Sequence, residues 1–144
     1  MIEIQHLSKS FGNLEVLKDV SLTIKKGEVV TIIGSSGSGK TTMMNIIGIL
    51  DRPTEGEYML DGVDVAHAKD RDLSMIRNKK IGFVFQQFNL LDQMSALENV
   101  ELPMIYQKVG ERERRERAQD ALTLVGLGKR MQHRPSQLSG GQKQ

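Results

Sequence analysis

Hydrophobic and polar residues alternate near the start of the chain, a pattern that is typical of β-strands with one buried face. Ile2 and Ile4 alternate with charged or polar neighbours, which predicts a first strand. The same period recurs more clearly in a second stretch, at Val20, Leu22 and Ile24. After a turn at residues 25–27, residues 29–33 read Val-Val-Thr-Ile-Ile. This apolar, β-branched run predicts a strand that is buried on both faces.

A helix and a hairpin are expected next. A glycine- and serine-rich loop at residues 34–39 leads into residues 41–50, which are apolar almost all round and predict a buried helix. Residues 51–56 contain Pro53 and form a break. Beyond it, residues 58–60 and 63–65 flank Asp61-Gly62, a sequence typical of a two-residue hairpin turn.

The character of the chain changes after a further short helix, expected at residues 71–78, and a further buried strand, expected at residues 81–85. Ser95 and Glu98 match a capping box, so we expect a helix to begin there, and Pro103 should limit its length. Residues 111–125 predict another helix, ended by Gly126, with an apolar face at Ala118, Ala121, Leu122 and Val125. The first ninety residues therefore read as mixed α/β and the rest as mostly helical.

Composition narrows the function classes. The chain has 144 residues, a net charge of +2 and no cysteine, which allows one domain and excludes disulfides and Cys-ligated metals. The charge is too small to indicate nucleic acid or an acidic membrane surface, and the signs in residues 111–117 alternate as on a solvated helix face. The start lacks the features of a signal peptide, and the apolar stretch at residues 43–50 is far shorter than a spanning helix. Any membrane role is therefore expected through a partner.

The glycine-rich loop carries the clearest chemistry. It matches the pattern G-x-x-x-x-G-K-[ST] with Gly34, Ser35, Ser36, Gly37, Ser38, Gly39, Lys40 and Thr41. Glycines allow successive backbone N–H groups to converge on a phosphate, and the following helix directs its positive end to the same place. Lys40 would contact the β- and γ-phosphates, and the Thr41 hydroxyl would bind Mg²⁺.

The plain alternative is a glycine-rich turn that binds nothing. We set it aside because the pattern has the context it requires, a predicted buried strand before it and a predicted helix after it. The base is expected to be adenine, since the nearest match to a guanine-reading N-K-x-D motif, at residues 78–81, lacks the carboxylate.

A second glycine motif lies near the end of the chain and consists of Leu138, Ser139, Gly140, Gly141 and Gln142. Two glycines after a serine at the start of a helix can form another anion-binding nest. A chain with two such cradles far apart in sequence could bind with the second one the γ-phosphate held by a neighbouring copy.

With these motifs the chain resembles the ATP-binding cassette (ABC) transporter ATP-binding subunits over essentially its whole length. Residues 34–41 look like the Walker A loop, Gln86 like the Q-loop glutamine and residues 138–142 like the family signature. Phe11 stands where the family has an aromatic ring that stacks on adenine, and Val16 where an apolar residue lines the same base. Residues 48–56, 81–91 and 98–103 resemble the subgroup that serves lipoprotein release, macrolide export and related systems.

The resemblance implies a fold, ligands and partners. The fold class would be α/β, a P-loop NTPase of the ABC type with an N-terminal antiparallel β part and a helical subdomain, incomplete at the C-terminus. ATP and Mg²⁺ would be the cofactors, with Thr42 also at the nucleotide and both Thr41 and Gln86 at the metal. Two copies would pair head to tail, each ATP lying between Lys40 of one and Ser139 of the other.

Transmembrane permease subunits are the further partners implied, and the chain would then lie at the cytoplasmic face of the membrane. The apolar patch of Phe88, Leu90 and Leu91 is a candidate contact for the permease. Its alternative is packing within the helical subdomain. The resemblance implies that the membrane subunits select the substrate, and the subgroup indicates export or extraction.

The residues that orient water and hold the metal in this family lie beyond the signature. We therefore expect a partial domain, with residues 1–90 as core and β part and 91–140 as helical subdomain, that binds nucleotide without hydrolysing it and folds poorly alone. Asp51 ends an apolar run, but it lies on the helix after the phosphate loop and precedes Arg52-Pro53, so it is not a metal ligand. The three histidines, His6, His67 and His133, precede the signature and are expected to be structural or solvated.

Two other classes of function remain open at this point. The first is a soluble ABC-type ATPase of DNA repair or chromosome maintenance, which would usually insert coiled coils or zinc sites between the phosphate loop and the signature. Fewer than a hundred residues separate Lys40 from Ser139, and they contain neither heptads nor cysteines, which argues against this class. The second is a non-catalytic nucleotide-binding regulator.

Overall fold

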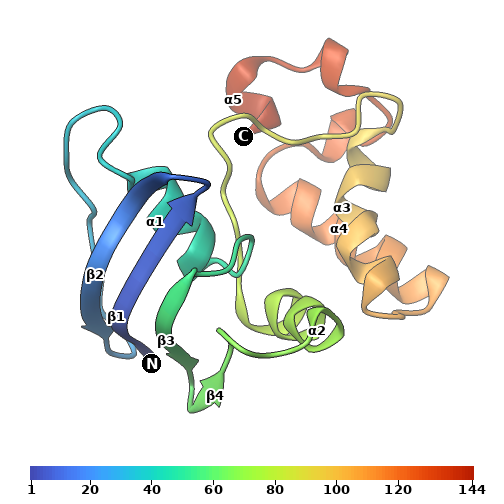
Figure 1. Cartoon of the computed structure of the whole chain (residues 1–144). Coiled ribbons are helices and arrows are strands. Elements are labelled where there is room, and N and C mark those ends of the chain that lie inside the picture. The colour runs from blue at the N-terminus through green and yellow to red at the C-terminus, as the bar shows by residue number, and fades with distance from the viewer. The chain divides into compact units, whose positions relative to one another are not determined.

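The computed structural model describes residues 1–144 and contains two units, Met1–Ile81 and Gly82–Gln144, each with its own hydrophobic core. A four-stranded antiparallel sheet forms the first unit (Figure 1). Its strands lie in the order β2-β1-β3-β4. Their bounds are β1 Ile2–Phe11, β2 Leu14–Ile24, β3 Glu55–Leu60 and β4 Val63–Asp64.

One of the two hairpins of this sheet, at Asp61-Gly62, was predicted, whereas the turn between β1 and β2 was not. β1 and β2 are paired from Ile2 opposite Ile24 to Phe11 opposite Leu14. Between β3 and β4, Asp61 and Gly62 both have positive φ angles, of 49° and 79°, as a type I′ turn requires. The alternating pattern thus identified β1 and β2 correctly, although both strands are longer than the predicted segments.

Two helices complete the first unit, α1 at Lys40–Ile47 and α2 at Asp70–Lys80. Met43 and Ile46 of α1 are buried in the same core as the sheet residues Ile4, Leu7, Leu17 and Tyr58. The Tyr58 hydroxyl donates a hydrogen bond to the carbonyl oxygen of Ile47 at 2.6 Å, and burial raises the pKa of Tyr58 to about 12. The helix that follows the phosphate loop is therefore anchored to the sheet at its far end.

Neither of the two predicted buried strands is present. Residues 29–33 and 81–85 have no strand structure, and their side chains are largely exposed, Val29 to 96% and Ile33 to 86%. A strand that is buried on both faces needs strands beside it and layers above and below it. The sheet of this chain ends at β2 and β4 and pairs with neither run. These two predictions were wrong, because a local apolar pattern cannot supply the pairing partners.

The second unit is built from α3 at Ala96–Tyr106 and α4 at Glu111–Leu124, which lie side by side (Figure 1). The short helices η1, η2 and α5 follow at Gly128–Arg130, Pro135–Gln137 and Gly140–Lys143. Its core consists of Ala96, Leu97, Ala118, Leu122 and Leu138.

Local signals account for the two long helices, with two corrections. The predicted capping box is present: the Ser95 N–H donates to Glu98 Oε2 at 2.7 Å, and the Glu98 N–H donates to Ser95 Oγ at 3.2 Å. α3 continues for three residues beyond Pro103, to Tyr106, so Pro103 limits the helix less sharply than expected, although a proline removes one helical hydrogen bond and crowds the preceding turn. On α4, Ala121 and Val125 are exposed, so the buried face is narrower than predicted.

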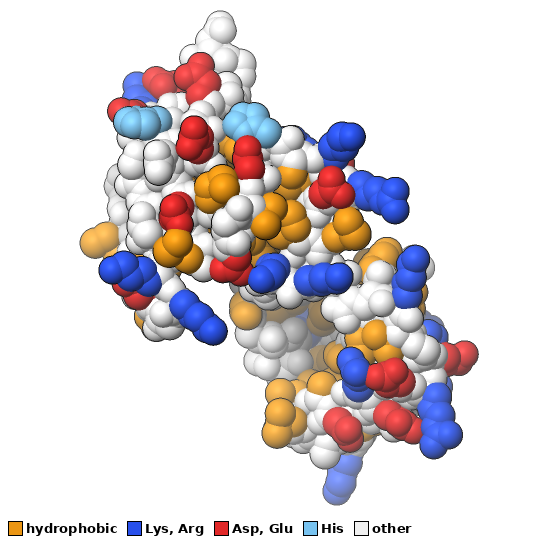
Figure 2. Space-filling view, turned by 90° about the horizontal axis from the view of Figure 1, so that it is seen from below, with side chains coloured by type: hydrophobic (Ala, Val, Ile, Leu, Met, Phe, Trp, Pro, Cys, Tyr) orange, Lys and Arg blue, Asp and Glu red, His pale blue; other side chains and the backbone are white.

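Charges on the surface are mixed in sign. In the view of Figure 2, Lys and Arg side chains are interspersed with Asp and Glu. Within residues 111–117, Arg112 pairs with Glu116 and Arg117 with Glu113, each four residues apart, which agrees with a solvated helix face. None of the helices combines the length and the apolar character needed to cross a membrane.

Candidate phosphate-binding site

The loop that precedes α1 is tightly packed at two of its glycines. A Cβ atom on Gly34 would lie 2.5 Å from Ser38 Oγ, and one on Gly39 would lie 2.8 Å from Leu17 Cδ2. Gly39 also has a φ of +84°, in the left-handed region that side chains disfavour. In contrast, a Cβ on Gly37 would meet nothing within 4 Å. The loop is thus packed against the sheet at Gly39 and open at Gly37.

The N-terminus of α1 offers free donors to this open space. Gly39 has no side chain to cap the helix, and the first turn contains no acidic residue. The first backbone N–H groups of a helix have no partner within it, and the helix dipole adds partial positive charge at the same end. These groups make the start of α1 a site that favours an anion.

The Lys40 ammonium is held within the loop itself. Its Nζ donates to the carbonyl oxygen of Gly34 at 2.9 Å and to that of Ser35, and it lies 3.4 Å from Ser38 Oγ. Lys40 therefore spans the loop from its first residue to its last, with neutral oxygens as its only partners. Carbonyl oxygens are weaker partners for an ammonium than the charged oxygens of a phosphate.

A hollow of about 270 Å³ lies at this loop. It is lined by Val16, Gly37, Ser38, Gly39, Lys40, Thr41 and Thr42. The lining offers backbone N–H groups, hydroxyls and an ammonium, but no carboxylate, so its chemistry fits a polyphosphate. Thr41 brings the hydroxyl that a divalent cation bound to that phosphate would need. Val16, predicted from sequence, is brought to the loop by β2.

Phe11, the predicted base-stacking residue, is the last residue of β1 and is paired with Leu14 of β2. Leu14 lies two residues before Val16 on that strand. Its ring is 52% exposed, and the ammonium of Lys9 lies 4.8 Å from the ring centroid. Lys9 belongs to none of the sequence motifs. The only local signal was its position two residues before Phe11 on the same strand, which places both side chains on one face.

Gln86 belongs to the second unit. There it lines a hollow of about 440 Å³ together with Gln87, Phe88, Asn89, Leu90, Asp92, Pro135 and Lys143. Phe88 of the predicted permease patch is partly exposed, and the Lys143 ammonium lies 5.9 Å from its ring centroid. Leu91 is exposed, whereas Leu90 lines a second pocket.

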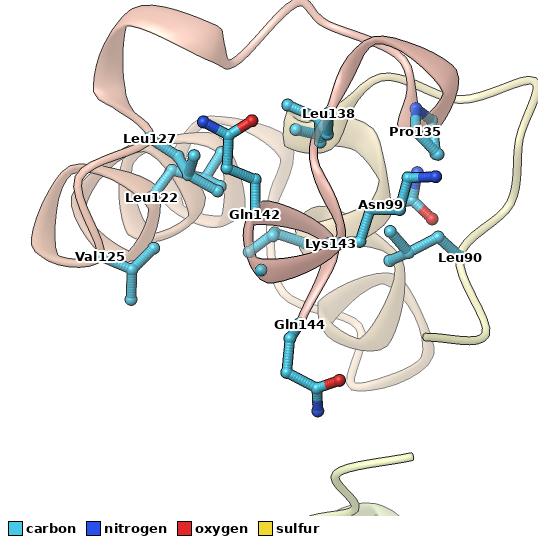
Figure 3. A pocket seen from close by; sticks show the side chains of 13 residues that line it. Leu90, Asn99, Leu122, Val125, Leu127, Pro135, Leu138, Gln142, Lys143 and Gln144 are labelled. Atoms are coloured by element: carbon cyan, nitrogen blue, oxygen red, sulfur yellow. The ribbon is translucent and has the colours of Figure 1, made fainter. Parts of the chain in front are cut away.

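The signature residues form the start of α5. Leu138 is buried in the core, and the Ser139 N–H donates to Gln142 Oε1 at 3.0 Å. A Cβ on Gly140 or on Gly141 would meet nothing within 4 Å, so this turn is open on its glycine side. Figure 3 shows α5 beside a pocket whose lining is mostly apolar and includes Leu90, Leu122, Leu127 and Leu138. The volume of this pocket is about 340 Å³.

The sequence matches a known protein family over most of its length. Residues 17–144 match the family described as "ABC transporter". The chain belongs to the ABC transporter family. The resemblance predicted from the phosphate loop and the signature is thereby confirmed.

Relatives within this family are similar over the whole chain. It is 55% identical to the ABC transporter ATP-binding protein YknY of Bacillus subtilis, of which it covers 64%. It is 49% identical to the lipoprotein-releasing system ATP-binding protein LolD of Bacteroides thetaiotaomicron, of which it covers 66%. It is 52% identical to the macrolide export ATP-binding/permease protein MacB of Marinobacter nauticus, over 23% of that protein. The predicted likeness to lipoprotein-release and macrolide-export types is confirmed.

Solved ABC cassettes share the fold. The dimeric post-hydrolysis structure of the ATP-binding cassette MJ0796, bound to ADP and Pi, has a TM-score of 0.89 and 48% identity. The match covers 99% of this chain and 65% of that one. The chain thus spans slightly less than two thirds of YknY and of MJ0796. The predicted α/β P-loop fold class is confirmed, while the roles of individual site residues stay predictions.

Proposed function

We propose that this chain is the ATP-binding subunit of an ABC transporter and that it binds Mg²⁺-ATP at residues 34–42. The observation that carries the proposal is the open hollow at the N-terminus of α1, whose lining supplies an ammonium, hydroxyls and unpaired N–H groups but no carboxylate. Such a lining suits a triphosphate, which carries several negative charges.

Each residue of the site has a proposed role. Backbone N–H groups from Gly37 to Thr42 surround the phosphates, and Lys40 leaves the carbonyls of Gly34 and Ser35 to bind the β- and γ-phosphates. The Thr41 hydroxyl and the Gln86 side chain bind the Mg²⁺ ion. Phe11 stacks on the adenine, and Val16, which already lines the hollow, contacts it from the side.

We further propose that two copies pair head to tail, with Ser139, Gly140 and Gly141 facing the nucleotide of the other copy. The similar cassette MJ0796 is described as dimeric, and the glycines of α5 are open to a ligand. Likeness to LolD and MacB supports a permease partner, a place at the cytoplasmic face of the membrane, and export or extraction as the task.

These 144 residues are proposed to bind ATP without turning it over. ATP hydrolysis requires a group that orients the attacking water, and the lining of the phosphate hollow contains no carboxylate and no imidazole. A steady release of phosphate from ATP that disappears with Lys40→Ala would refute this part of the proposal.

The test of the main proposal is calorimetric titration of the chain with ATP in the presence of Mg²⁺, followed by the same titration with GTP. We expect saturable ATP binding, weaker GTP binding, and a lower affinity for both nucleotides when Lys40 is replaced by alanine. If a folded sample shows no nucleotide binding, the proposed function is wrong.

A further inference from the structure

Lys9 is a lysine held almost out of solvent beside the predicted adenine site. Its Nζ donates to Asp51 Oδ1 at 2.7 Å and to the carbonyl oxygen of Arg52 at 2.7 Å, and its side chain is only 11% exposed. The same ammonium lies 4.8 Å from the centroid of the Phe11 ring. Three partners leave this flexible side chain little freedom to move.

The partners of Lys9 are themselves fixed. Asp51 Oδ1 also accepts a hydrogen bond from the Arg52 N–H at 2.7 Å. The Arg52 guanidinium donates to the carbonyl oxygen of Ala68 at 2.6 Å and to Asp70 at 2.7 Å. The Lys9 ammonium is thereby tied to the segment after α1 and to the start of α2, all within the first unit.

Phe11, in contrast, has little other support. It is the last residue of β1, at the turn of a hairpin, and its ring is half exposed. An exposed ring samples several orientations, and each base that stacks on it must first fix one of them. A cation above one face attracts the ring electrostatically and leaves the opposite face for an aromatic ligand.

We propose that Lys9 is a positioning residue for nucleotide base recognition: it holds the Phe11 ring with one face covered, so that the base stacks on the other face. This inference rests on the proposed binding of ATP at residues 34–42. It assigns to Lys9 an effect on the base alone, since the phosphates are bound by the loop and by Lys40.

The experiment compares a ligand that has a base with one that has none. Calorimetry would give the affinities of the 144-residue chain for Mg²⁺-ATP and for Mg²⁺-tripolyphosphate, with Lys9 intact and with Lys9→Met. We expect Lys9→Met to weaken ATP binding by about 2- to 10-fold and to leave tripolyphosphate binding unchanged. Lys9→Arg should restore most of the loss, because a guanidinium can pair with Asp51 and cover the ring.

Two further variants separate positioning from general stability. Lys18→Met removes an exposed lysine that pairs with Glu15 on β2 and should leave both affinities unchanged. In a Phe11→Ala background, Lys9→Met should have no further effect on ATP binding. If Lys9→Met does not fold, Asp51→Asn tests the same link, because it loosens the anchor of Lys9 and should also reduce only ATP binding.

The outcomes distinguish this inference from the function on which it rests. Equal losses of ATP and tripolyphosphate binding would overturn the role of Lys9, as would a loss of ATP affinity that persists without Phe11, or no loss at all. If tripolyphosphate does not bind the unaltered chain, the proposed phosphate site itself is refuted.

Discussion

The ammonium nitrogen of Lys40 lies 2.9 Å from the carbonyl oxygen of Gly34, six residues earlier in the same loop. Together with the bond to the Ser35 carbonyl, this contact closes the phosphate loop on itself. A triphosphate offers the ammonium charged oxygens in place of neutral carbonyl oxygens, so that attraction between opposite charges adds to the hydrogen bonds. Exchange of partners by Lys40 is therefore favourable when the ligand binds.

We expect Lys40→Ala to weaken Mg²⁺-ATP binding by about 10- to 100-fold, which corresponds to the loss of about one hydrogen bond to a charged group. Isothermal titration calorimetry would measure the change. Lys26→Ala is the matched control, since Lys26 is exposed in the turn after β2 and should not affect binding. Equal affinities for the Lys40 and Lys26 variants would contradict the site.

Two glycines with positive φ provide a test of the packing that positions β3. Gly56 and Gly62 have φ angles of 95° and 79°, so alanine is strained at both, by about 1–2 kcal/mol. A Cβ on Gly56 would also lie 2.4 Å from the carbonyl oxygen of His6 and 2.6 Å from Leu7 Cα, whereas one on Gly62 would meet nothing within 4 Å.

Gly56→Ala should therefore lower the free energy of unfolding by at least about 3 kcal/mol, because the backbone of β1 must also move. Gly62→Ala should cost only the conformational part, about 1–2 kcal/mol. Urea denaturation followed by circular dichroism would measure both. Similar costs for the two variants would mean that the close approach of Gly56 to β1 contributes nothing to stability.

Features that depend on neighbours in sequence were predictable. The Ser95 capping box, the Asp61-Gly62 turn and the phosphate loop each lie within eight consecutive residues, and local hydrogen bonds and backbone angles determine them. The link between Lys9 and Asp51 joins residues 42 apart, and nothing in the sequence near either residue identifies the other as its partner. That link follows only from the way the sheet folds back on the segment after α1.

The missing strands have the same explanation. An apolar, β-branched run such as residues 29–33 shows that a segment suits a buried strand, but the partner strands decide whether it becomes one. In this chain the run has no strand beside it, and its side chains lie at the surface except for that of Ile32, which packs against the core.

This exposure leads to a prediction about association. Clusters of exposed apolar residues promote self-association, so the double substitution Val29→Lys and Ile33→Lys should lower the proportion of oligomers in sedimentation velocity. The free energy of unfolding should change by less than about 0.5 kcal/mol, as is usual for surface positions. Val20→Lys is the contrasting control, since Val20 packs against the core and its replacement should destabilise the fold. If the double variant unfolds the chain, residues 29–33 are buried in solution.

Because of the ion pairs of Asp61, we expect the stability of the first unit to depend on pH in the acid range. Hydrogen bonds from the Lys80 ammonium, at 2.8 Å, and from the N-terminal ammonium of Met1 lower the pKa of Asp61 from 3.8 to about 2. A carboxyl group with a lowered pKa in the folded state stabilises that state when it is ionised. The stabilisation is complete above about pH 5 and disappears as the pH falls towards 2.

Asp61→Asn should remove this contribution, so its free energy of unfolding should lie below that of the unaltered chain by a constant amount from pH 7 to about pH 5. The difference should then shrink as the pH is lowered to 2, because the carboxyl group of the unaltered chain becomes protonated. Urea titrations at a series of pH values would measure both curves, with Asp120→Asn, an exposed aspartate on α4, as the control for removal of one carboxylate. A difference between the two curves that stays constant down to pH 2 would show that Asp61 is not held ionised by Lys80 and the N-terminus.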